Sequence, residues 1–585
     1  MPWMKRTEAE TADEFLPSAP DPGSSRKEKY MNETVYQNDN SLNEGASALL
    51  GRGQEGEVRL LYSMANRHGL IAGATGTGKT VSLKVLAENF SSAGVPVLIT
   101  DIKSDISSIA EPGTMNEKIA ERLRASQVDP ASFAMQGYPV RFFDVFGRQG
   151  IPLRALVSDL GPMLLSRLLD LSEAQQGVLN IVFKAADDRG WELTDLKDLK
   201  SMIRWCADHK KELEDEYGAV SPQSAATLQR KLLELENQNG TELFGLPAFD
   251  VRDLFERQGG LGLITLIECS ELYMQPLLYS AVILWLLSEL YEQLPEAGDL
   301  DRPRVAVFID EAHLLFDDAP KVLRDRMEQM IRLIRSKGCA VFLVSQSPSD
   351  IPDAILAQLS NRIQHALRAY TPAELKKAKA AAAGFRQNPN LNTLEALQAL
   401  RTGEALVSVL DEDGAPIAVE RILMMPPHSS FEALGREKIQ KISEADPAFI
   451  KYGTPVDPKT AYEILEELEE QEEAALQAEQ LEKARLKERE KEEKELARQR
   501  EKAQKAAARE AERQAREYER QRTQSQSAAA KSAKKAMRSA ARSVGRSTGE
   551  AITRGLMKTS SSSAKRAASR AAGSLLSDLF GSFFR

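Results

Sequence analysis

A glycine-rich segment between a short apolar run and a stretch of helical spacing has the residue types needed to hold phosphate. It follows the pattern GxxxxGKT and consists of Gly73, Ala74, Thr75, Gly76, Thr77, Gly78, Lys79 and Thr80. Backbone N–H groups in such a loop turn inward around the phosphates, and the N-terminus of the following helix adds its dipole. The Lys79 ammonium can neutralise the β and γ phosphates, and the Thr80 hydroxyl can bind magnesium. The pattern therefore predicts a P-loop that binds ATP and Mg²⁺.

Hydrolysis of a bound triphosphate needs a further metal ligand and a group that activates water. An apolar run, residues 305–309, leads directly into Asp310 and Glu311. A buried strand here would deliver Asp310 to the magnesium ion and leave Glu311 as the base for the attacking water. Two acids can also simply end a strand, but the P-loop upstream favours the catalytic interpretation.

Two further polar positions flank the next apolar run, residues 340–344. Gln346 can hydrogen-bond the γ-phosphate or the attacking water, or it can be an ordinary polar residue where the strand ends. Arg335 can act as an arginine finger on a neighbouring subunit, although a cation at the end of a helix also suits the helix dipole. Arg332 and Arg362 are weaker candidates for the same role.

These residues need a sheet that brings several strand ends to one edge. Apolar runs alternate with stretches of helical spacing at residues 69–72, 95–100, 261–267, 305–309 and 340–344. Continuous apolar strands separated by helices predict an α/β fold with a mostly parallel sheet covered on both faces. Ligands of such sheets bind at the carboxyl ends of the strands, and the charged cluster Asp101, Lys103 and Asp105 follows one of them.

Composition divides the chain into an arm, a globular region and a charged extension. Residues 1–50 are polar without periodicity, which predicts a disordered N-terminal arm. Residues 51–455 are predicted to form the ATPase domain, in which 110–260 is a mostly helical insertion. Within this domain, residues 404–422 are typical of a hairpin closed by a turn that contains glycine.

The extension is predicted to be a charged helix over 456–525, followed by a Ser-, Ala- and Arg-rich disordered tail over 526–585. A coiled coil is possible, but the leucines of the helix do not keep a 3.5-residue repeat. The chain has a net charge of −9, yet residues 522–585 hold thirteen Lys or Arg and two acids. Such a basic tail can contact nucleic acid, bind an anionic membrane or simply keep the protein soluble.

The three cysteines and the hydropathy pattern indicate the cellular compartment of the protein. Cys206, Cys269 and Cys339 are far apart, which indicates neither a disulfide framework nor a zinc site. The longest apolar stretch, around 281–287, is much shorter than the roughly 20 residues that span a bilayer. We therefore expect a cytoplasmic protein without a transmembrane segment.

Longer segments around these motifs resemble a known family. Residues 67–80, 310–313 and 335–346 look like the HerA/FtsK branch of P-loop motor ATPases, and residues 161–167, 403–408 and 451–457 resemble the bacterial HerA-helicase-like family. The resemblance covers about 45–465. It implies a RecA-like core with an inserted helical region, a ring-shaped, hexameric oligomer, ATP hydrolysis across subunit interfaces, and DNA translocation.

Two functions fit these observations. One is an oligomeric, helicase-like ATPase that translocates DNA, which the resemblance and the basic tail favour. The other is a nucleotide-switched interaction or membrane-associated scaffold ATPase that does not act on DNA and uses the charged helix as a spacer. An inactive relative is disfavoured because every expected catalytic position is filled.

Overall fold

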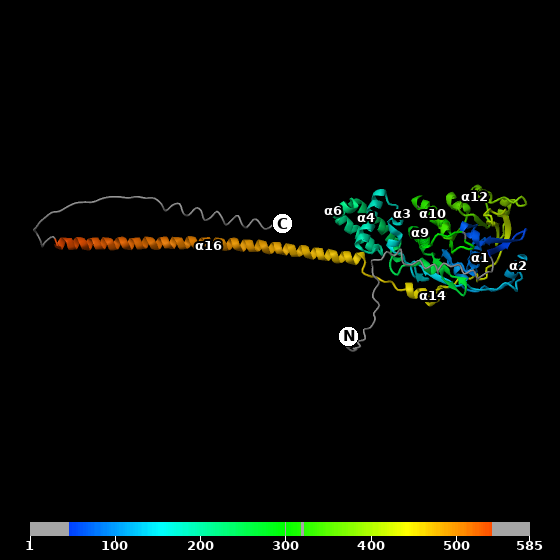
Figure 1. The fold of residues 1–585 in the computed structure, drawn as a ribbon, viewed down its shortest axis with the longest axis horizontal. Helices are drawn as coiled ribbons and strands as arrows, with labels where there is room; N and C mark the ends of the chain where they lie inside the picture. The colour runs from blue at the N-terminus through cyan, green and yellow to red at the C-terminus, as the bar shows by residue number, and fades with distance from the viewer. Residues whose placement is uncertain (1–45, 299, 317–320, 541–585) are drawn as a thin grey trace, which may run out of the picture. The chain divides into compact units, whose positions relative to one another are not determined.

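The computed structural model describes residues 46–298, 300–316 and 321–540 and shows an α/β protein (Figure 1). The chain forms two compact units, residues 1–473 and 474–585. Unit 1 contains a twelve-stranded sheet in the order β2-β1-β14-β13-β12-β3-β11-β10-β4-β9-β5-β6. Its mostly parallel central part confirms the predicted RecA-like fold class.

The strands from β12 to β6 in this order run parallel, whereas the other end of the sheet is antiparallel. The parallel strands are β3 (Gly69–Ala72), β4 (Val97–Asp101), β5 (Val140–Asp144), β6 (Ile151–Pro152), β9 (Ile264–Glu268), β10 (Val305–Ile309), β11 (Cys339–Ser345) and β12 (Asn361–Gln364). The antiparallel strands are β1 (Ser47–Arg52), β2 (Glu57–Leu61), β13 (Glu404–Ser408) and β14 (Glu420–Met424), and β7 (Arg257–Gln258) pairs separately with β8 (Leu261–Gly262).

The helices of unit 1 fall into two sets. One set covers the sheet, and the other forms a helical group in which α3, α4 and α6 lie together at one end of the unit (Figure 1). The helices near the sheet are α1 (Lys79–Ser92), α2 (Glu117–Ala125), α9 (Pro276–Gln293), α10 (Lys321–Ile334), α11 (Asp353–Leu356), α12 (Pro372–Ala383), α13 (Thr393–Ala399), α14 (Arg436–Ala445) and α15 (Pro447–Tyr452). The helical group consists of α3 (Val157–Leu168), α4 (Glu173–Arg189), α5 (Leu196–Asp208), α6 (Lys210–Tyr217), α7 (Pro222–Asn237) and α8 (Gly240–Leu243).

Three predicted boundaries differ from the structure. Residues 47–50, expected in the disordered arm, belong to β1, because pairing with β2 and β14 satisfies their backbone groups. The range 110–260 supplies β5 and β6 to the main sheet as well as the helical group. Residues 526–540, expected in the tail, continue the long helix α16 (Ala461–Ala540), since they contain no Gly or Pro to end it. Residues 1–45 and 541–585 lie outside the described residues.

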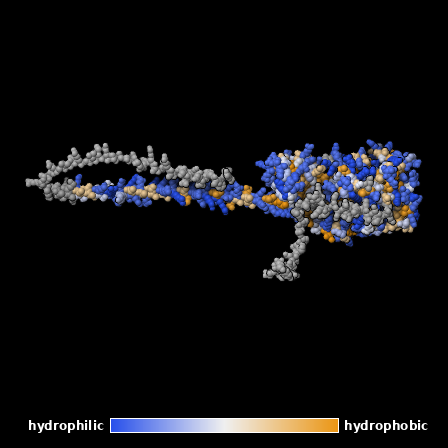
Figure 2. Space-filling view, in the orientation of Figure 1, coloured by the Kyte–Doolittle hydropathy of each residue, from blue (hydrophilic) through white to orange (hydrophobic). Residues whose placement is uncertain are grey.

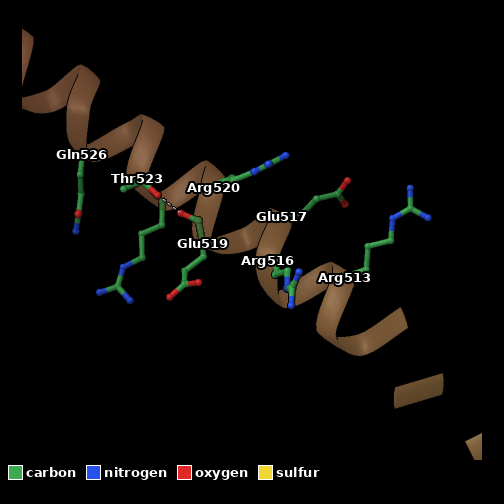
Figure 3. A pocket seen from close by; sticks show the side chains of 8 residues that line it. Arg513, Arg516, Glu517, Glu519, Arg520, Thr523 and Gln526 are labelled. Carbon is green, nitrogen blue, oxygen red and sulfur yellow. Dashed lines mark hydrogen bonds between the residues drawn. The ribbon is translucent and has the colours of Figure 1, made fainter. Parts of the chain in front are cut away.

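The part of α16 in unit 2 is exposed along its described length. Figure 2 shows a mostly hydrophilic surface on this helix. Its larger apolar side chains, Leu476, Leu481, Leu486 and Leu496, are each about half exposed and do not share one helical face. The depression between Arg513 and Gln526 is lined by α16 alone (Figure 3), so we assign no site to it.

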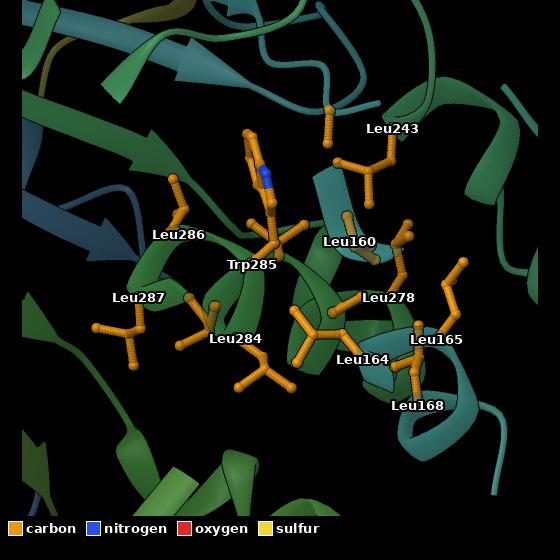
Figure 4. Packing of buried hydrophobic residues seen from close by; sticks show 14 of the residues in the cluster. Leu160, Leu164, Leu165, Leu168, Leu243, Leu278, Leu284, Trp285, Leu286 and Leu287 are labelled. Carbon is orange, nitrogen blue, oxygen red and sulfur yellow. The ribbon is translucent and has the colours of Figure 1, made fainter. Parts of the chain in front are cut away.

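Both faces of the sheet are buried, which explains the continuous apolar runs. Along β10, Val307 and Ile309 face one core, whereas Phe308 faces the other and stacks on Phe342 with ring centroids 5.0 Å apart. On the first face, Trp285 of α9 packs in a cluster with leucines of α3 (Figure 4). In the described parts of the chain, no helix has the length and apolar character required to cross a membrane.

Candidate functional site

The glycine-rich loop connects β3 to α1 at the carboxyl edge of the sheet. The Gly73 N–H donates to the Ser345 carbonyl at the end of β11 (3.2 Å), and the Ala74 N–H donates to the Ala366 carbonyl just after β12 (3.0 Å). Gly73 has φ +152°, and a Cβ at this position would lie 2.5 Å from the Cβ of His365. The loop is thus anchored to the two strands that flank β3, and only glycine fits its first position.

Lys79 and Thr80 begin α1 directly after the loop. The Lys79 side chain is buried, and its Nζ donates to the Gly73 carbonyl (2.7 Å). Burial lowers the pKa of Lys79, which favours an anionic partner for this ammonium. Thr80 is half-buried at the same helix N-terminus, while Thr75 and Gly76 are exposed at the tip of the loop. The predicted phosphate-binding residues therefore share one small region.

Asp310 and Glu311 follow β10, which is separated from β3 only by β11. Because these strands are parallel, both acids lie at the same edge of the sheet as the loop. The Asp310 N–H donates to Thr100 Oγ1 at the end of β4 (3.1 Å). Burial, followed by the charge of neighbouring Glu311, raises the pKa of Asp310 to about 6. A buried carboxylate of this kind is stabilised by a cation.

Glu311 is held in an ion pair that the sequence did not reveal. Its backbone has φ +44°, an unusual conformation for a residue with a side chain, and the carboxylate is buried. Oε1 accepts a hydrogen bond from Lys103, and Oε2 lies 3.4 Å from His313 Nδ1. Burial would raise the pKa of Glu311, but the hydrogen bond and charge of Lys103, together with the charge of Lys79, lower it.

Lys103 was not among the predicted site residues. The sequence did place Lys103 in a charged cluster directly after the predicted strand 95–100. This strand is β4, which lies next to β10 in the sheet, so the cluster lies near Asp310 and Glu311. Asp101 ends β4 and accepts hydrogen bonds from the backbone N–H groups of Lys103 (3.2 Å) and Ile106 (2.9 Å). Burial, then the charges of Asp105 and Glu268, raise the pKa of Asp101 to about 8.

Gln346 lies beside the loop, whereas Arg335 lies at the opposite edge of the sheet. Gln346 is exposed and directly follows Ser345, whose carbonyl accepts the Gly73 N–H. Arg335 is exposed and precedes β11, a strand of seven residues that is about 20 Å long. Arg335 therefore cannot reach the loop of its own chain.

The two weaker arginine candidates have different surroundings. Arg332 is exposed on α10, on the same side of β11 as Arg335. The Arg362 guanidinium donates to the carbonyl groups of Leu356, Leu359 and Gly384. Through these contacts Arg362 stabilises the fold of its own chain.

The carboxyl edge of the sheet thus brings together the groups that phosphoryl transfer to water requires. The loop offers N–H donors, Lys79 and Lys103 supply positive charge, and Asp310 and Glu311 supply adjacent carboxylates. Thr80 and Asp310 offer the oxygen ligands that Mg²⁺ prefers. The same edge can therefore hold a nucleotide and activate water.

A family model described as helicase HerA-like C-terminal matches residues 47–566. No curated protein matches the chain. Among solved structures, the unbound bacterial conjugative coupling protein TrwBdeltaN70 aligns with 16% identity and a TM-score of 0.43, over 65% of this chain and 90% of that one. VirB4 of Thermoanaerobacter pseudethanolicus aligns with 17% identity and a TM-score of 0.41, over 65% of this chain and 97% of that one. Plasmid coupling protein TrwB in complex with ADP and Mg²⁺ aligns with 16% identity and a TM-score of 0.42, over 69% and 92% of the two chains.

Proposed function

The chain belongs to the helicase HerA-like C-terminal family, and from this premise we propose that it is an ATP-hydrolysing motor. The observation that carries this proposal is the meeting of Lys79, Asp310 and Glu311 at one edge of the sheet. In P-loop NTPases, a lysine on the phosphates, a carboxylate on the metal side and a positioned water are the groups that lower the barrier to hydrolysis.

Each residue has a defined task in the proposed reaction. The N–H groups of Gly73 to Thr80 surround the phosphates, and Lys79 exchanges the Gly73 carbonyl for a phosphate oxygen. Thr80 and Asp310 would hold Mg²⁺, which neutralises charge on the phosphates. Glu311 accepts the proton of the attacking water, and Gln346 orients this water or the γ-phosphate. The buried edge keeps these groups in place before the nucleotide arrives.

We further propose that the motor acts on DNA, through an exposed cationic surface beside the loop. This α12 surface comprises Arg368, Tyr370, Lys376, Lys377 and Lys379. Its five members are all exposed, and Tyr370 is 81% exposed, as expected for a platform on which a base can stack. Residues 366–386 contain five Lys or Arg and a single acid, in a chain of net negative charge. Lysines on such a surface can contact phosphates.

The α12 surface is tied to both sides of the candidate nucleotide site. The segment that leads from β12 to this surface includes Ala366, whose carbonyl accepts the Ala74 N–H of the loop. Lys377 forms an ion pair with Asp350 (3.1 Å), in the segment that follows Gln346. A change in either segment on ATP binding would therefore move this surface, as translocation requires.

We also propose that the protein self-associates, as a hexameric ring in which Arg335 acts on the nucleotide of a neighbouring subunit. The position of Arg335 at the edge opposite its own loop supports action between subunits. A guanidinium supplied from a neighbour stabilises the charge of the transition state. The three cysteines are buried and free, which suits the cytoplasmic location that we propose.

The first prediction concerns hydrolysis. Lys79→Ala is expected to abolish ATP binding and turnover, because it removes the cation of the loop. Glu311→Gln is expected to retain ATP binding but to lower turnover at least about a hundredfold, because the base is lost. Steady-state phosphate release and nucleotide binding should be measured on the full chain, with Lys118→Ala on the exposed face of α2 as the control. Glu311→Gln turnover at the wild-type rate would contradict the assignment.

The second prediction concerns DNA. We expect single- or double-stranded DNA to stimulate ATP turnover at low salt and less so at high salt, because phosphate contacts release counterions. Lys376→Glu combined with Lys379→Glu should remove most of the stimulation and leave basal turnover unchanged. Lys210→Glu combined with Lys211→Glu on α6 is the matched control. Turnover that DNA does not change would favour the nucleotide-switched scaffold ATPase, with its charged helix as a spacer.

The third prediction concerns Arg335. Lys79→Ala chains and Arg335→Ala chains are each expected to be nearly inactive. Mixed oligomers should recover turnover, because some interfaces combine an intact loop from one chain with an intact Arg335 from the other. Tagged chains would show by pull-down that mixing has occurred. Mixed oligomers without recovered turnover would rule out action of Arg335 between subunits.

A further inference from the structure

We propose that Lys103 is a γ-phosphate sensor that pairs with Glu311 and moves to the γ-phosphate when ATP binds. The inference rests on the proposed ATPase function and adds a residue to which that function assigns no task. It follows from the ion pair, from the rigidity of the chain around Lys103 and from the position of the two site lysines.

The ion pair involves one of the two carboxylate oxygens of the proposed base. Lys103 Nζ donates to Glu311 Oε1, and the Glu311 carboxylate is buried. The ammonium competes with a water molecule for Oε1, whereas Oε2 accepts no hydrogen bond from the described residues. The ion pair therefore ties Lys103 directly to the residue that we propose as the base.

Hydrogen bonds hold the backbone around Lys103, whereas the Lys103 side chain extends from it toward Glu311. The Asp101 carboxylate accepts the N–H groups of Lys103 and Ile106, which closes the chain over the end of β4. Ser104 has φ +56°, and its hydroxyl donates to Glu268 Oε2 at the end of β9 (2.8 Å). In contrast to this anchored backbone, the Lys103 side chain is 42% exposed. A long side chain on an anchored backbone can exchange one anionic partner for another.

The two lysines of the site lie at the same edge of the sheet. Lys79 begins α1 after β3 and the loop, whereas Lys103 and Glu311 follow β4 and β10 of the same parallel group of strands. A γ-phosphate held by Lys79 would thus place a second anion near Lys103. A terminal phosphate carries more negative charge than a carboxylate and offers several acceptor oxygens, so it competes well for the ammonium.

This exchange would allow the site to distinguish ATP from ADP. ADP has no γ-phosphate and would leave Lys103 on Glu311. ATP would draw Lys103 away from Glu311 Oε1 and gain a charge-assisted hydrogen bond. Release of phosphate after hydrolysis would return Lys103 to Glu311. The partner of Lys103 would thus report whether a γ-phosphate is bound.

The test compares the affinities for a non-hydrolysable ATP analogue and for ADP, each with Mg²⁺, by calorimetry on the full chain. Lys103→Ala is expected to weaken binding of the ATP analogue about tenfold, relative to any change in ADP affinity, because a charge-assisted hydrogen bond is lost. ADP affinity should stay close to wild type, which also shows that the variant is folded. Lys103→Arg should retain most of the discrimination, and Lys118→Ala should change neither affinity.

Two results would overturn the proposal. If Lys103→Ala weakened both nucleotides equally, Lys103 would only support the site. If it changed neither affinity, the ammonium would not reach the γ-phosphate. Failure of the wild-type chain to bind either nucleotide would instead contradict the proposed ATPase function. The two proposals can therefore fail separately.

Discussion

The parallel alignment of β3, β11, β10 and β4 is the constraint on which the candidate site depends. Their backbone hydrogen bonds pair Ser345 with Ala72 and Ile309 with both Leu343 and Thr100. All four strands therefore end at one edge, and the residues that follow them meet there. The two cores on either face of the sheet hold this register, because a shift by one residue would turn Phe308 toward the wrong core.

Electrostatics then determine how the groups at this edge behave. Burial raises the pKa values of Asp101 and Asp310, and lowers that of Lys79. Opposite charges at close range reduce the free-energy cost of these buried ions. Lys103 provides this compensation for Glu311, and Lys79 donates to a carbonyl of its own loop. A magnesium–triphosphate complex would supply both a cation for Asp310 and anions for the lysines, so its binding would satisfy several groups at once.

Local pattern was sufficient to predict β3, β4, β9, β10 and β11 and to place the loop and the acid pair at strand ends. The loop and the acids are contiguous motifs that directly follow apolar runs, so their positions could be predicted, whereas their chemistry stays a proposal. The ion pair could not be predicted, because Lys103 and Glu311 are 208 residues apart and meet only through the strand order. The helix boundary at residue 525 was also wrong, since composition changes there although the helical propensity does not. Arg335 was predicted from its motif, and its role stays a proposal.

The central claim is that the loop and the acid pair form a single nucleotide site. A structure determined with Mg²⁺ and a non-hydrolysable ATP analogue tests it most directly. The account predicts a metal ion at about 2.1 Å from Thr80 Oγ1, on the side of the Asp310 carboxylate, with the γ-phosphate on Lys79 Nζ. A nucleotide bound elsewhere, or phosphates in the loop with Asp310 and Glu311 remote from them, would contradict the account.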